Sequence, residues 1–201
     1  MTARRILTFL LPLVLGMAAC AADTSHEAAE TTAAPDAATA TEAGGESVAT
    51  ELPLIDIPNA LLIQDGILGG GQPDEAQLRQ AADAGYRTII NTRGPDEAAD
   101  FAFEEELVRS LGMEYVFLPV SGGDDVNADK ARALAEILEQ PDALPAMVHC
   151  RSGNRVGILF AAKAFVVDGV DAEAAMEFGT ASGMRRVPEQ LKSMLQDAGD
   201  H

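Results

Sequence analysis

From about Leu52 onward, short apolar runs alternate with stretches that carry helix-capping residues, and few folds accommodate this order. The apolar runs have the length and composition of buried strands, and the stretches between them have the start and stop signals of helices. This alternation is typical of an α/β domain with a central, mostly parallel sheet flanked by helices. The chain has no tryptophan and only 4% aromatic residues, so its core must consist of Ala, Leu, Ile and Val. That composition favours a helix-rich domain over an all-β fold.

The positions of the expected elements follow from apolar runs, caps and glycine stops. The sequence predicts one or two edge strands within 61–68, a turn at 69–73, and buried central strands at 88–92, 114–120 and 146–149. It predicts helices at 74–85, about 100–111, 127–140 and 156–167, and two short helices from about 171 and 188. Asp74 and Gln77 are spaced as a capping box, which sets the start of the first helix.

Two segments precede this domain. Residues 1–20 have a basic start, an apolar run too short to span a bilayer and a small-residue exit, which indicates an export signal. Residues 21–51 are a low-complexity Ala/Thr/Glu tract, which predicts a disordered linker. Residues 52–201 remain for one catalytic domain of ordinary size.

The end of the export signal also predicts a location for the protein. Its last residues, LGMAAC, resemble the lipobox of bacterial lipoproteins, and this resemblance implies that Cys20 is lipidated and becomes the N-terminus. We expect an exported, periplasmic protein anchored by lipid in a bacterial membrane, with simple secretion as the alternative. Ala21 follows the cysteine where an Asp would oppose sorting, so the lipoprotein resemblance implies the outer membrane.

The charge of the chain excludes one class of partner. The net charge is −18, from 14 Lys and Arg against 32 Asp and Glu, and there is no basic tract. A nucleic-acid backbone is repelled by such a chain, so neither DNA nor RNA is an expected partner. The three histidines, His26, His149 and His201, lack the spacing of metal ligands, and no metal or other cofactor is expected.

The stretch VHCRSGNRV, residues 148–156, is the candidate active site, because it joins a predicted buried strand to a predicted helix. A tight turn and the free N–H groups of a helix start form an anion-binding nest, here built from Arg151, Ser152, Gly153 and Asn154. The field of this nest favours the reactive thiolate of Cys150, and we expect His149 to favour it further. Arg155 has the planar fork that holds two oxygens of a phosphoryl or sulfuryl group. The sequence therefore predicts covalent catalysis by Cys150.

Simpler roles for three of these residues stay open at this point. The alternatives are Cys150 as a small buried hydrophobe, His149 as a buried imidazole bonded to backbone, and Arg151 as a solvated surface side chain. The polar residues after Cys150 favour the reactive cysteine, because a hydrophobic core would not use them. If Cys20 is acylated, Cys150 lacks an intramolecular partner, so no structural disulfide is expected.

Four separated motifs carry a resemblance to a known family: GGGQPDEAQL, AGYRTIINTRGPDE, EYVFLPVSGG and MVHCRSGNRVG. From about residue 61 to 183 the chain resembles the beta-lactamase-hydrolase-like phosphatase-like family, a branch of the dual-specificity tyrosine phosphatase fold. The resemblance implies Cys150 as nucleophile and Arg155 as the anion-binding arginine. Asn91 and Arg93 match the family's Asn-x-Arg at a strand end, which implies either a structural tie to the active-site loop or contact with substrate.

Two departures from the usual tyrosine phosphatase signature leave the reaction open. Four residues rather than five separate Cys150 from Arg155, and Val156 stands where a Ser or Thr would assist the leaving thiolate. Ser152 is the candidate to replace that hydroxyl. The string CRSGNR also resembles the persulfide-carrying loop of rhodanese-type sulfurtransferases, so the group that the loop carries is either phosphoryl or sulfur.

A general acid distinguishes these reactions, because a leaving alkoxide needs a proton and sulfane transfer does not. Asp124 and Asp125 are the candidates, 26 and 25 residues before Cys150, and the alternative is an ordinary solvated turn. The first-choice function is hydrolysis of a small phosphorylated molecule or a phosphoprotein through an intermediate on Cys150. The alternatives are sulfur transfer from a sulfur-containing substrate and a catalytically weak anion-binding module. The sequence does not indicate an oligomeric state.

Overall fold

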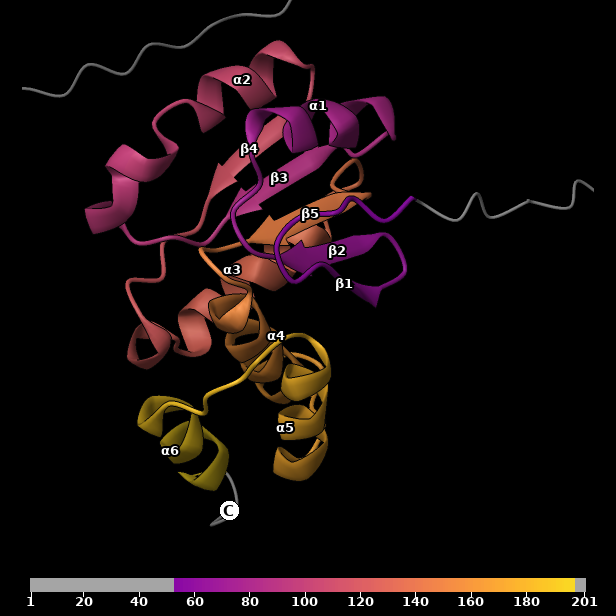
Figure 1. The fold of residues 1–201 in the computed structure, drawn as a ribbon. Helices are drawn as coiled ribbons and strands as arrows, with labels where there is room; N and C mark the ends of the chain where they lie inside the picture. Colours follow the sequence, from indigo (N-terminus) through magenta and orange to yellow (C-terminus); the bar gives the residue numbers. More distant parts are fainter. Residues whose placement is uncertain (1–52, 198–201) are drawn as a thin grey trace, which may run out of the picture. The chain divides into compact units, whose positions relative to one another are not determined.

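The computed structural model describes residues 53–197, which form a five-stranded sheet with helices on both faces (Figure 1). The strands are β1 (Leu61–Gln64), β2 (Ile67–Gly70), β3 (Thr88–Asn91), β4 (Glu114–Phe117) and β5 (Ala146–His149). Their order in the sheet is β1-β2-β5-β3-β4, and only β1 is antiparallel to its neighbour. The expected α/β fold with a mostly parallel sheet is confirmed. The predicted export signal, Cys20 and the linker lie outside the described residues.

Helices and short 3-10 turns connect these strands. The α-helices are α1 (Glu75–Asp83), α2 (Glu104–Ser110), α3 (Ala128–Leu138), α4 (Asn154–Val166), α5 (Ala172–Ala181) and α6 (Glu189–Asp197). The 3-10 turns are η1 (Pro95–Phe101) and η2 (Gly123–Asp125). The capping box predicted for α1 is present, since Asp74 Oδ1 accepts the Gln77 N–H and Gln77 Oε1 accepts the Asp74 N–H, both at 2.8 Å. Within residues 53–197, no helix is long and apolar enough to cross a membrane.

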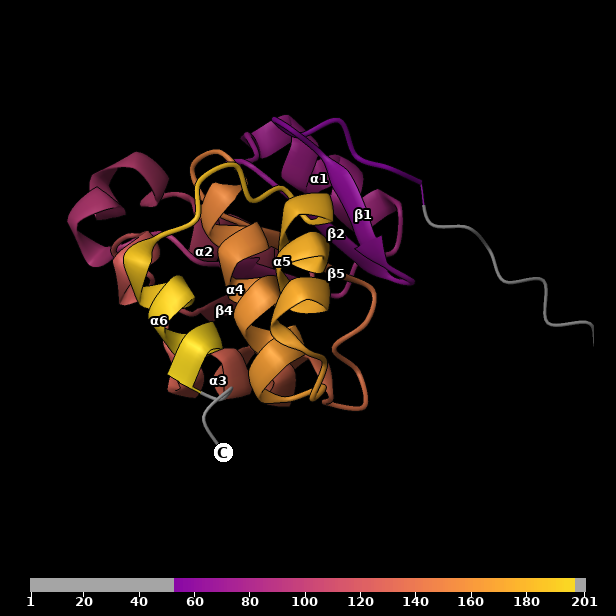
Figure 2. The ribbon, with the colours of Figure 1, turned by 90° about the horizontal axis from the view of Figure 1, so that it is seen from below.

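The two faces of the sheet bury separate apolar clusters. Side chains alternate along a strand, so Ile89 and Met147 pack beneath α1 and α2, while Ile90 and Val148 pack against α3 and α4. Figure 2 shows α5 and α6 lying beside α4, on the side away from the sheet. α4 is therefore buried on most of its surface, with the sheet on one side and helices on the other.

Small residues allow the chain after α5 to approach α4 closely. A Cβ added at Gly157 of α4 would lie 2.1 Å from the backbone nitrogen of Met184, and one added at Gly179 would lie 2.6 Å from Ala161 Cβ. These distances are too short for any side chain. The segment between α5 and α6 is thereby held against the first turn of α4.

Three predictions for the strands and the turn at 69–73 differ from the structure. Only β1 of the 61–68 segment is an edge strand, because β2 lies between β1 and β5 and continues through Gly69 and Gly70, which were expected in a turn. These glycines are needed by packing, since an added Cβ would come within 2.4 Å of Ile63 and 2.5 Å of Ile57, respectively. The central strand expected at 114–120 is the edge strand β4 and ends at Phe117.

The helix expected at about 100–111 is divided in two. The chain first forms the 3-10 turn η1 with Pro95 at its start, and α2 begins only at Glu104. Proline at the first position of a helical segment supplies a helical φ. Helical structure therefore begins at Pro95, earlier in the sequence than expected. α4 also begins earlier than expected, so Arg155 lies in its first turn rather than in the preceding loop.

Candidate active site

The carboxyl ends of the three inner strands, β2, β5 and β3, lie side by side at one end of the sheet, and the candidate residues follow them (Figure 1). His149, the last residue of β5, is in register with Gly70 of β2 and with Asn91 of β3. The chain then forms the Cys150 loop, defined as residues 150–155, of which Asn154 and Arg155 are the first two residues of α4. In open parallel sheets, ligands bind at the carboxyl ends of the strands.

Cys150 is buried, with 1% of its surface exposed, and its Sγ accepts the backbone N–H of Gly153 at 3.1 Å. Gly153 has φ of 85°, a left-handed conformation that glycine adopts without strain and that turns its N–H toward the sulfur. The N–H groups of residues 151, 152, 154 and 155 make no hydrogen bond with the described residues. These N–H groups of the loop are therefore available as donors to an anion, as an anion-binding helix start requires.

Arg155 is held by a carboxylate from η1. Its Nη1 and Nη2 donate to Glu97 Oε2 and Oε1 at 2.6 and 3.0 Å, and Nη1 also donates to the carbonyl of Val120 at 2.8 Å. A guanidinium has five N–H donors, and these contacts take three. The remaining two, on Nε and Nη2, share one edge of the guanidinium. One bidentate edge thus binds Glu97 and the other is left for an oxyanion.

Arg155 and Glu97 each stabilise the charged form of the other. Burial lowers the pKa of Arg155, but the hydrogen bonds to Glu97 and the charges of Cys150 and Glu97 outweigh it, so the pKa is raised above its ordinary value. The hydrogen bond from Arg155 is the largest of the effects that lower the pKa of Glu97 to about 2. Both groups are ionised at neutral pH, and Cys150 lies close enough to act on Arg155.

Asn91 and Arg93 are buried and bonded within the protein, so they form a structural tie. Asn91 Oδ1 accepts the Arg93 N–H at 2.8 Å, and its Nδ2 donates to the Tyr115 hydroxyl at 3.0 Å. Arg93 donates from Nε to Glu97 at 3.2 Å, and its Nη2 pairs with Asp100. Through Glu97 this tie reaches Arg155.

His149 contacts a buried carboxylate instead of Cys150. Its Nε2 lies 2.7 Å from Glu104 Oε1, and both residues are fully buried. Its carbonyl accepts hydrogen bonds from the N–H and hydroxyl of Thr92 at 2.8 and 2.9 Å. The Sγ of Cys150 has no hydrogen bond from His149 among the described residues, and His149 Nδ1 is buried without a partner there.

The outer side of the Cys150 loop contacts the segment after α5. Asn154 Oδ1 accepts the N–H groups of Arg185 and Arg186 at 2.7 and 3.0 Å, so this side chain anchors that segment. Ser152 is exposed, and its carbonyl accepts Asn59 Nδ2 at 3.3 Å. No hydrogen bond joins its hydroxyl to Cys150 in the part of the chain described, whereas Val156 is buried where the usual hydroxyl would be.

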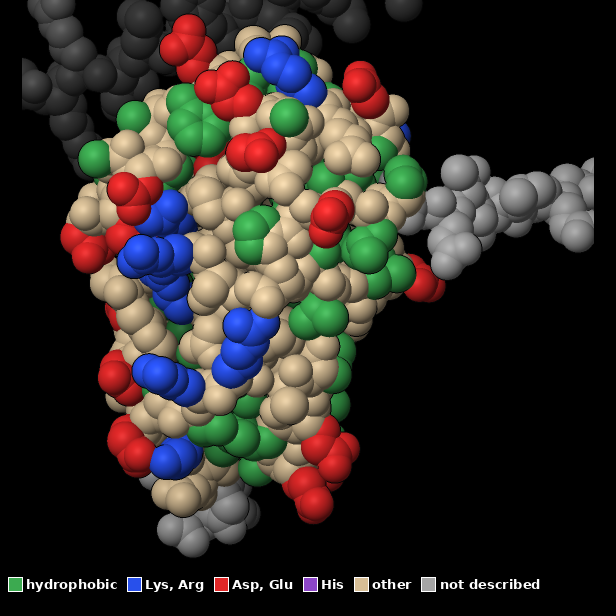
Figure 3. All heavy atoms as spheres, in the orientation of Figure 1, with side chains coloured by type: hydrophobic (Ala, Val, Ile, Leu, Met, Phe, Trp, Pro, Cys, Tyr) green, Lys and Arg blue, Asp and Glu red, His purple; other side chains and the backbone are tan. Residues whose placement is uncertain are grey.

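Cationic side chains surround the loop although the whole chain is acidic. Arg151, Arg185 and Arg186 are exposed beside it, and Figure 3 shows Lys and Arg side chains gathered over this end of the sheet and over α6. A local positive potential attracts anions to a site even where the net charge is negative.

The two candidate acids differ in their surroundings. Asp125 Oδ2 accepts the Ser121 N–H at 2.8 Å and pairs with Lys130, and the hydrogen bond to Lys130 lowers the pKa of Asp125 most. Asp124 lines a cavity of about 480 Å³ together with Asn154 and Arg186. Of the two candidate acids, Asp124 shares a cavity with the Cys150 loop, whereas Asp125 is kept ionised by its neighbours.

Three residues of this site were not among the sequence candidates. Gln72 and Glu97 lie within the motifs GGGQP and GPDE, which mark them only as members of a family pattern. Glu104 begins an acidic EEE run that is typical of a solvated helix start, and nothing in the sequence indicates its burial. Within residues 53–197, no group of three or more His, Cys, Asp or Glu side chains is arranged to hold a metal ion.

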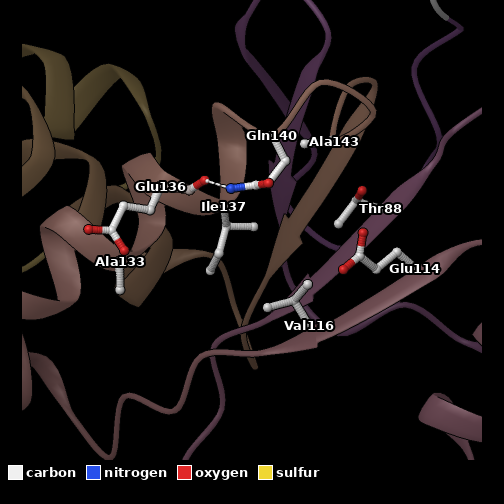
Figure 4. Close-up of a pocket in the computed structure, with 8 residues that line it drawn as sticks. All are labelled: Thr88, Glu114, Val116, Ala133, Glu136, Ile137, Gln140 and Ala143. Carbon is white, nitrogen blue, oxygen red and sulfur yellow. Dashed lines mark hydrogen bonds between the residues drawn. The ribbon is translucent and has the colours of Figure 1, made fainter. Parts of the chain in front are cut away.

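A second cavity, of about 320 Å³, lies at the opposite end of the sheet (Figure 4). It is lined by the first residues of β3 and β4, Thr88 and Glu114, and by one face of α3, where Gln140 Nε2 donates to the carbonyl of Glu136 at 3.0 Å. The Thr88 hydroxyl is buried without a hydrogen-bond partner among the described residues. Its lining residues include no cysteine, histidine or arginine.

Comparison with known proteins agrees with the class that the fold and the loop define, a phosphatase-like domain. Residues 63–165 match the family model of the beta-lactamase hydrolase-like protein, phosphatase-like domain, and the chain belongs to this family. A beta-lactamase hydrolase-like protein of Xylella fastidiosa strain Temecula1 is 32% identical over 120 residues, which are 58% of this chain and 26% of that protein. The chain therefore spans about a quarter of the length of this curated relative.

Solved structures show the same fold. A putative phosphatase from Shewanella putrefaciens CN-32 superposes with a TM-score of 0.56 at 22% identity, over 72% of this chain and 93% of that chain. The structure of PTPMT1 superposes with a TM-score of 0.53 at 22% identity, over 70% of this chain and 94% of that chain. The fold is that of tyrosine and dual-specificity phosphatases, as the sequence motifs predicted.

Proposed function

We propose that the domain hydrolyses phosphoesters with Cys150 as nucleophile and Arg155 as the residue that binds the phosphoryl oxygens. The observation that carries this proposal is the arrangement of these two side chains. Gly153 donates to the Cys150 sulfur, and Glu97 holds Arg155 by one edge so that the second edge is left for an oxyanion. A nucleophile beside preorganised donors is the arrangement that covalent phosphoryl transfer requires.

The proposed reaction has two steps. The Cys150 thiolate forms a bond to phosphorus while the bond to the leaving oxygen breaks, and Asp124 gives that oxygen a proton. Asp124 then takes a proton from water as the water oxygen bonds to phosphorus, the sulfur–phosphorus bond breaks, and the thiolate is restored. Asp124 is favoured over Asp125 because the lowered pKa of Asp125 opposes its holding a proton at neutral pH. The proposed substrate is a small phosphorylated molecule or a phosphoprotein.

A second candidate function rests on the loop itself. Only four residues separate Cys150 from Arg155, and the buried Val156 supplies no hydroxyl to the departing sulfur. Both features suit a sulfurtransferase, in which Cys150 would take a sulfane sulfur from a donor and pass it to a thiophilic acceptor. This reaction needs no general acid, so the role of Asp124 separates the two functions.

Parallel assays of the purified domain test the proposal. We expect turnover of an aryl phosphate that inorganic phosphate and vanadate inhibit, and little transfer of sulfur from thiosulfate to cyanide. Faster turnover of thiosulfate than of any phosphoester would replace the proposal with sulfur transfer. No turnover of either substrate would leave the domain as an anion-binding module.

We also propose that the protein is exported and held by a lipid on Cys20, most suitably in an outer membrane. This proposal is supported by the LGMAAC segment alone. Acyl chains contribute about 0.8 kcal/mol for each buried methylene, so a lipidated protein would fractionate with membranes. Cys20→Ala should leave the protein uncleaved or soluble, and unmodified wild type in the soluble periplasmic fraction would disprove the anchor.

A further inference from the structure

Glu104 is a buried carboxylate whose burial calls for an explanation. It lies in the first turn of α2 with no exposed surface, and no Lys or Arg of residues 53–197 forms an ion pair with it. Its Oε1 lies 2.7 Å from His149 Nε2, and its Oε2 accepts Gln72 Nε2 at 2.5 Å. Burying an ionised group is costly, and an apolar residue of similar size often serves stability equally well. A role other than stability is therefore the better explanation.

The hydrogen bonds around Glu104 run in one direction. Gln72 Nε2 donates to Glu104 Oε2, and a proton carried on His149 Nε2 is donated to Oε1, since carboxylate oxygens accept. Gln72 Oε1 in turn accepts Arg93 Nη1 at 3.0 Å, and an arginine only donates. The orientation of the Gln72 amide is thereby fixed. A reversed amide would place its Nε2 against the Arg93 donor and its Oε1 against the Glu104 acceptor.

This chain of hydrogen bonds reaches both members of the proposed catalytic pair. At one end, His149 directly precedes Cys150. At the other end, Arg93 donates to Glu97, which binds Arg155 by two hydrogen bonds. The nucleophile and the anion-binding arginine are thus connected through one partly buried amide and one buried carboxylate.

We propose that Gln72 and Glu104 are positioning residues that set Cys150 and Arg155 relative to each other, through His149 on one side and through Arg93 and Glu97 on the other. The inference rests on the proposed function, because it assigns a role to residues that do not touch the substrate. A carboxylate and an amide suit this role because their opposite hydrogen-bonding patterns define a single arrangement. Small displacements of reacting groups are costly, about 10²-fold in rate for a shift of 1 Å.

Exchanging the two side chains tests the proposal. Glu104→Gln keeps the size of the side chain but brings two donors together, and Gln72→Glu brings two carboxylates together. We expect each single variant to lose about 10²-fold in kcat/KM for an aryl phosphate. In the double variant Q72E/E104Q we expect the amide at 104 to donate to the carboxylate at 72, which also accepts Arg93, and the amide oxygen to accept His149. Only the hydrogen bond from residue 72 to the Pro73 carbonyl, 3.2 Å in the wild type, is lost. The double variant should recover to within about threefold of wild type.

The matched control is Glu105→Gln, which changes the neighbouring carboxylate, exposed and paired with Arg109, and should leave kcat/KM as it is. Affinity for inorganic phosphate, measured by calorimetry, should fall in the single variants and recover in the double variant.

Folded single variants with wild-type kcat/KM, or a double variant as slow as the single ones or unable to fold, would overturn the proposal. If the single variants fail to fold, the double variant alone decides. A wild type that binds phosphate but hydrolyses no phosphoester would refute the proposed function, while phosphate affinity across the variants still tests the positioning.

Discussion

The two ends of the sheet each carry a cavity, yet they differ in how their buried polar groups are bonded. At the carboxyl ends of the strands, Asn91, Arg93 and Glu104 are buried and bonded to partners from distant parts of the chain. At the amino ends, the Thr88 hydroxyl is buried without a partner among residues 53–197, and the nearby Glu114 is exposed (Figure 4). Cavity size does not separate the ends. The extent of pairing does, because most buried polar groups at the carboxyl ends are bonded, although His149 Nδ1 there also lacks a partner among residues 53–197.

This difference indicates that bonded buried polar groups hold the residues of the candidate site in place. A paired buried network fixes the positions of its members, and its cost in desolvation is offset only if nearly every donor and acceptor is used. An isolated buried hydroxyl fixes nothing and costs stability. We therefore expect substitutions at the carboxyl ends to change turnover, and substitutions at the amino ends to change stability alone.

The largest expected effect comes from the nucleophile. Cys150→Ser should reduce hydrolysis of any phosphoester to the background rate, because a hydroxyl at its ordinary pKa is a poor nucleophile. The variant should still bind inorganic phosphate, since Arg155 and the loop N–H groups are unchanged. Steady-state turnover and calorimetry measure the two properties. Retained turnover would mean that the buried Cys150 is only a small apolar residue.

Asp124→Asn should lower kcat/KM for an alkyl phosphate, which reports the first step, by roughly 10² to 10⁴, the usual contribution of a positioned acid. The loss should shrink for aryl phosphates with acidic leaving groups, because these depart without a proton. Asp125→Asn is the matched control, and its rates should stay near wild type. Equal losses across all leaving groups, or a larger loss for Asp125→Asn, would remove Asp124 from the role of acid.

Arg155→Lys should be nearly as damaging as Arg155→Ala, with a loss of about 10² to 10³ in kcat/KM, because an ammonium cannot bind Glu97 and an oxyanion by two edges at once. Inhibition by phosphate and vanadate should weaken in parallel. Arg151→Ala, at an exposed position of the same loop, should be milder. A lysine variant with ordinary turnover would show that Arg155 acts only as a nearby charge.

The Glu97 carboxylate predicts a pH dependence of stability. Its pKa is about 2 in the folded protein against an ordinary 4.5, so its contribution is complete above pH 4.5 and is lost as the pH falls toward 2. The free energy of unfolding of wild type should therefore exceed that of Glu97→Gln above pH 4.5, and the gap should narrow between 4.5 and 2. Denaturant titrations at several pH values measure it, and a gap that stays constant would contradict the assigned pairing.

The smallest effect is expected at the amino ends of the strands. Thr88→Val removes the unpaired hydroxyl while keeping the shape of the side chain, so it should raise the free energy of unfolding by about 1 kcal/mol. Turnover should be unchanged. A loss of activity in this variant would break the contrast between the two ends of the sheet.

Local patterns predicted what depends on neighbours in the sequence. The capping box of Asp74 and Gln77 and the turn from Cys150 into α4 were both predictable, because three to five residues determine each. Gly69 and Gly70 were misassigned to a turn, since the reason for them is contact with Ile57 and Ile63 rather than local conformation.

The contacts inside the site could not be predicted from the sequence. Glu97 and Arg155 are 58 residues apart, and Glu104 and His149 are 45 residues apart, so only the packed fold brings each pair together. Glu104 also stands in an acidic run whose other members, Glu105 and Glu106, are exposed. A sequence pattern of this kind does not distinguish a buried carboxylate from a solvated one.

The central claim, that Cys150 carries the phosphoryl group, is tested most directly by trapping the intermediate. Asp124→Asn should slow the attack of water more than the first step when the leaving group is good, so the intermediate should accumulate on an aryl phosphate. Acid quenching during turnover, followed by mass spectrometry of the peptide that contains Cys150, should show one added phosphoryl group on the sulfur. Release of phosphate without any adduct on Cys150, or a persulfide there as the only adduct formed, would contradict the account.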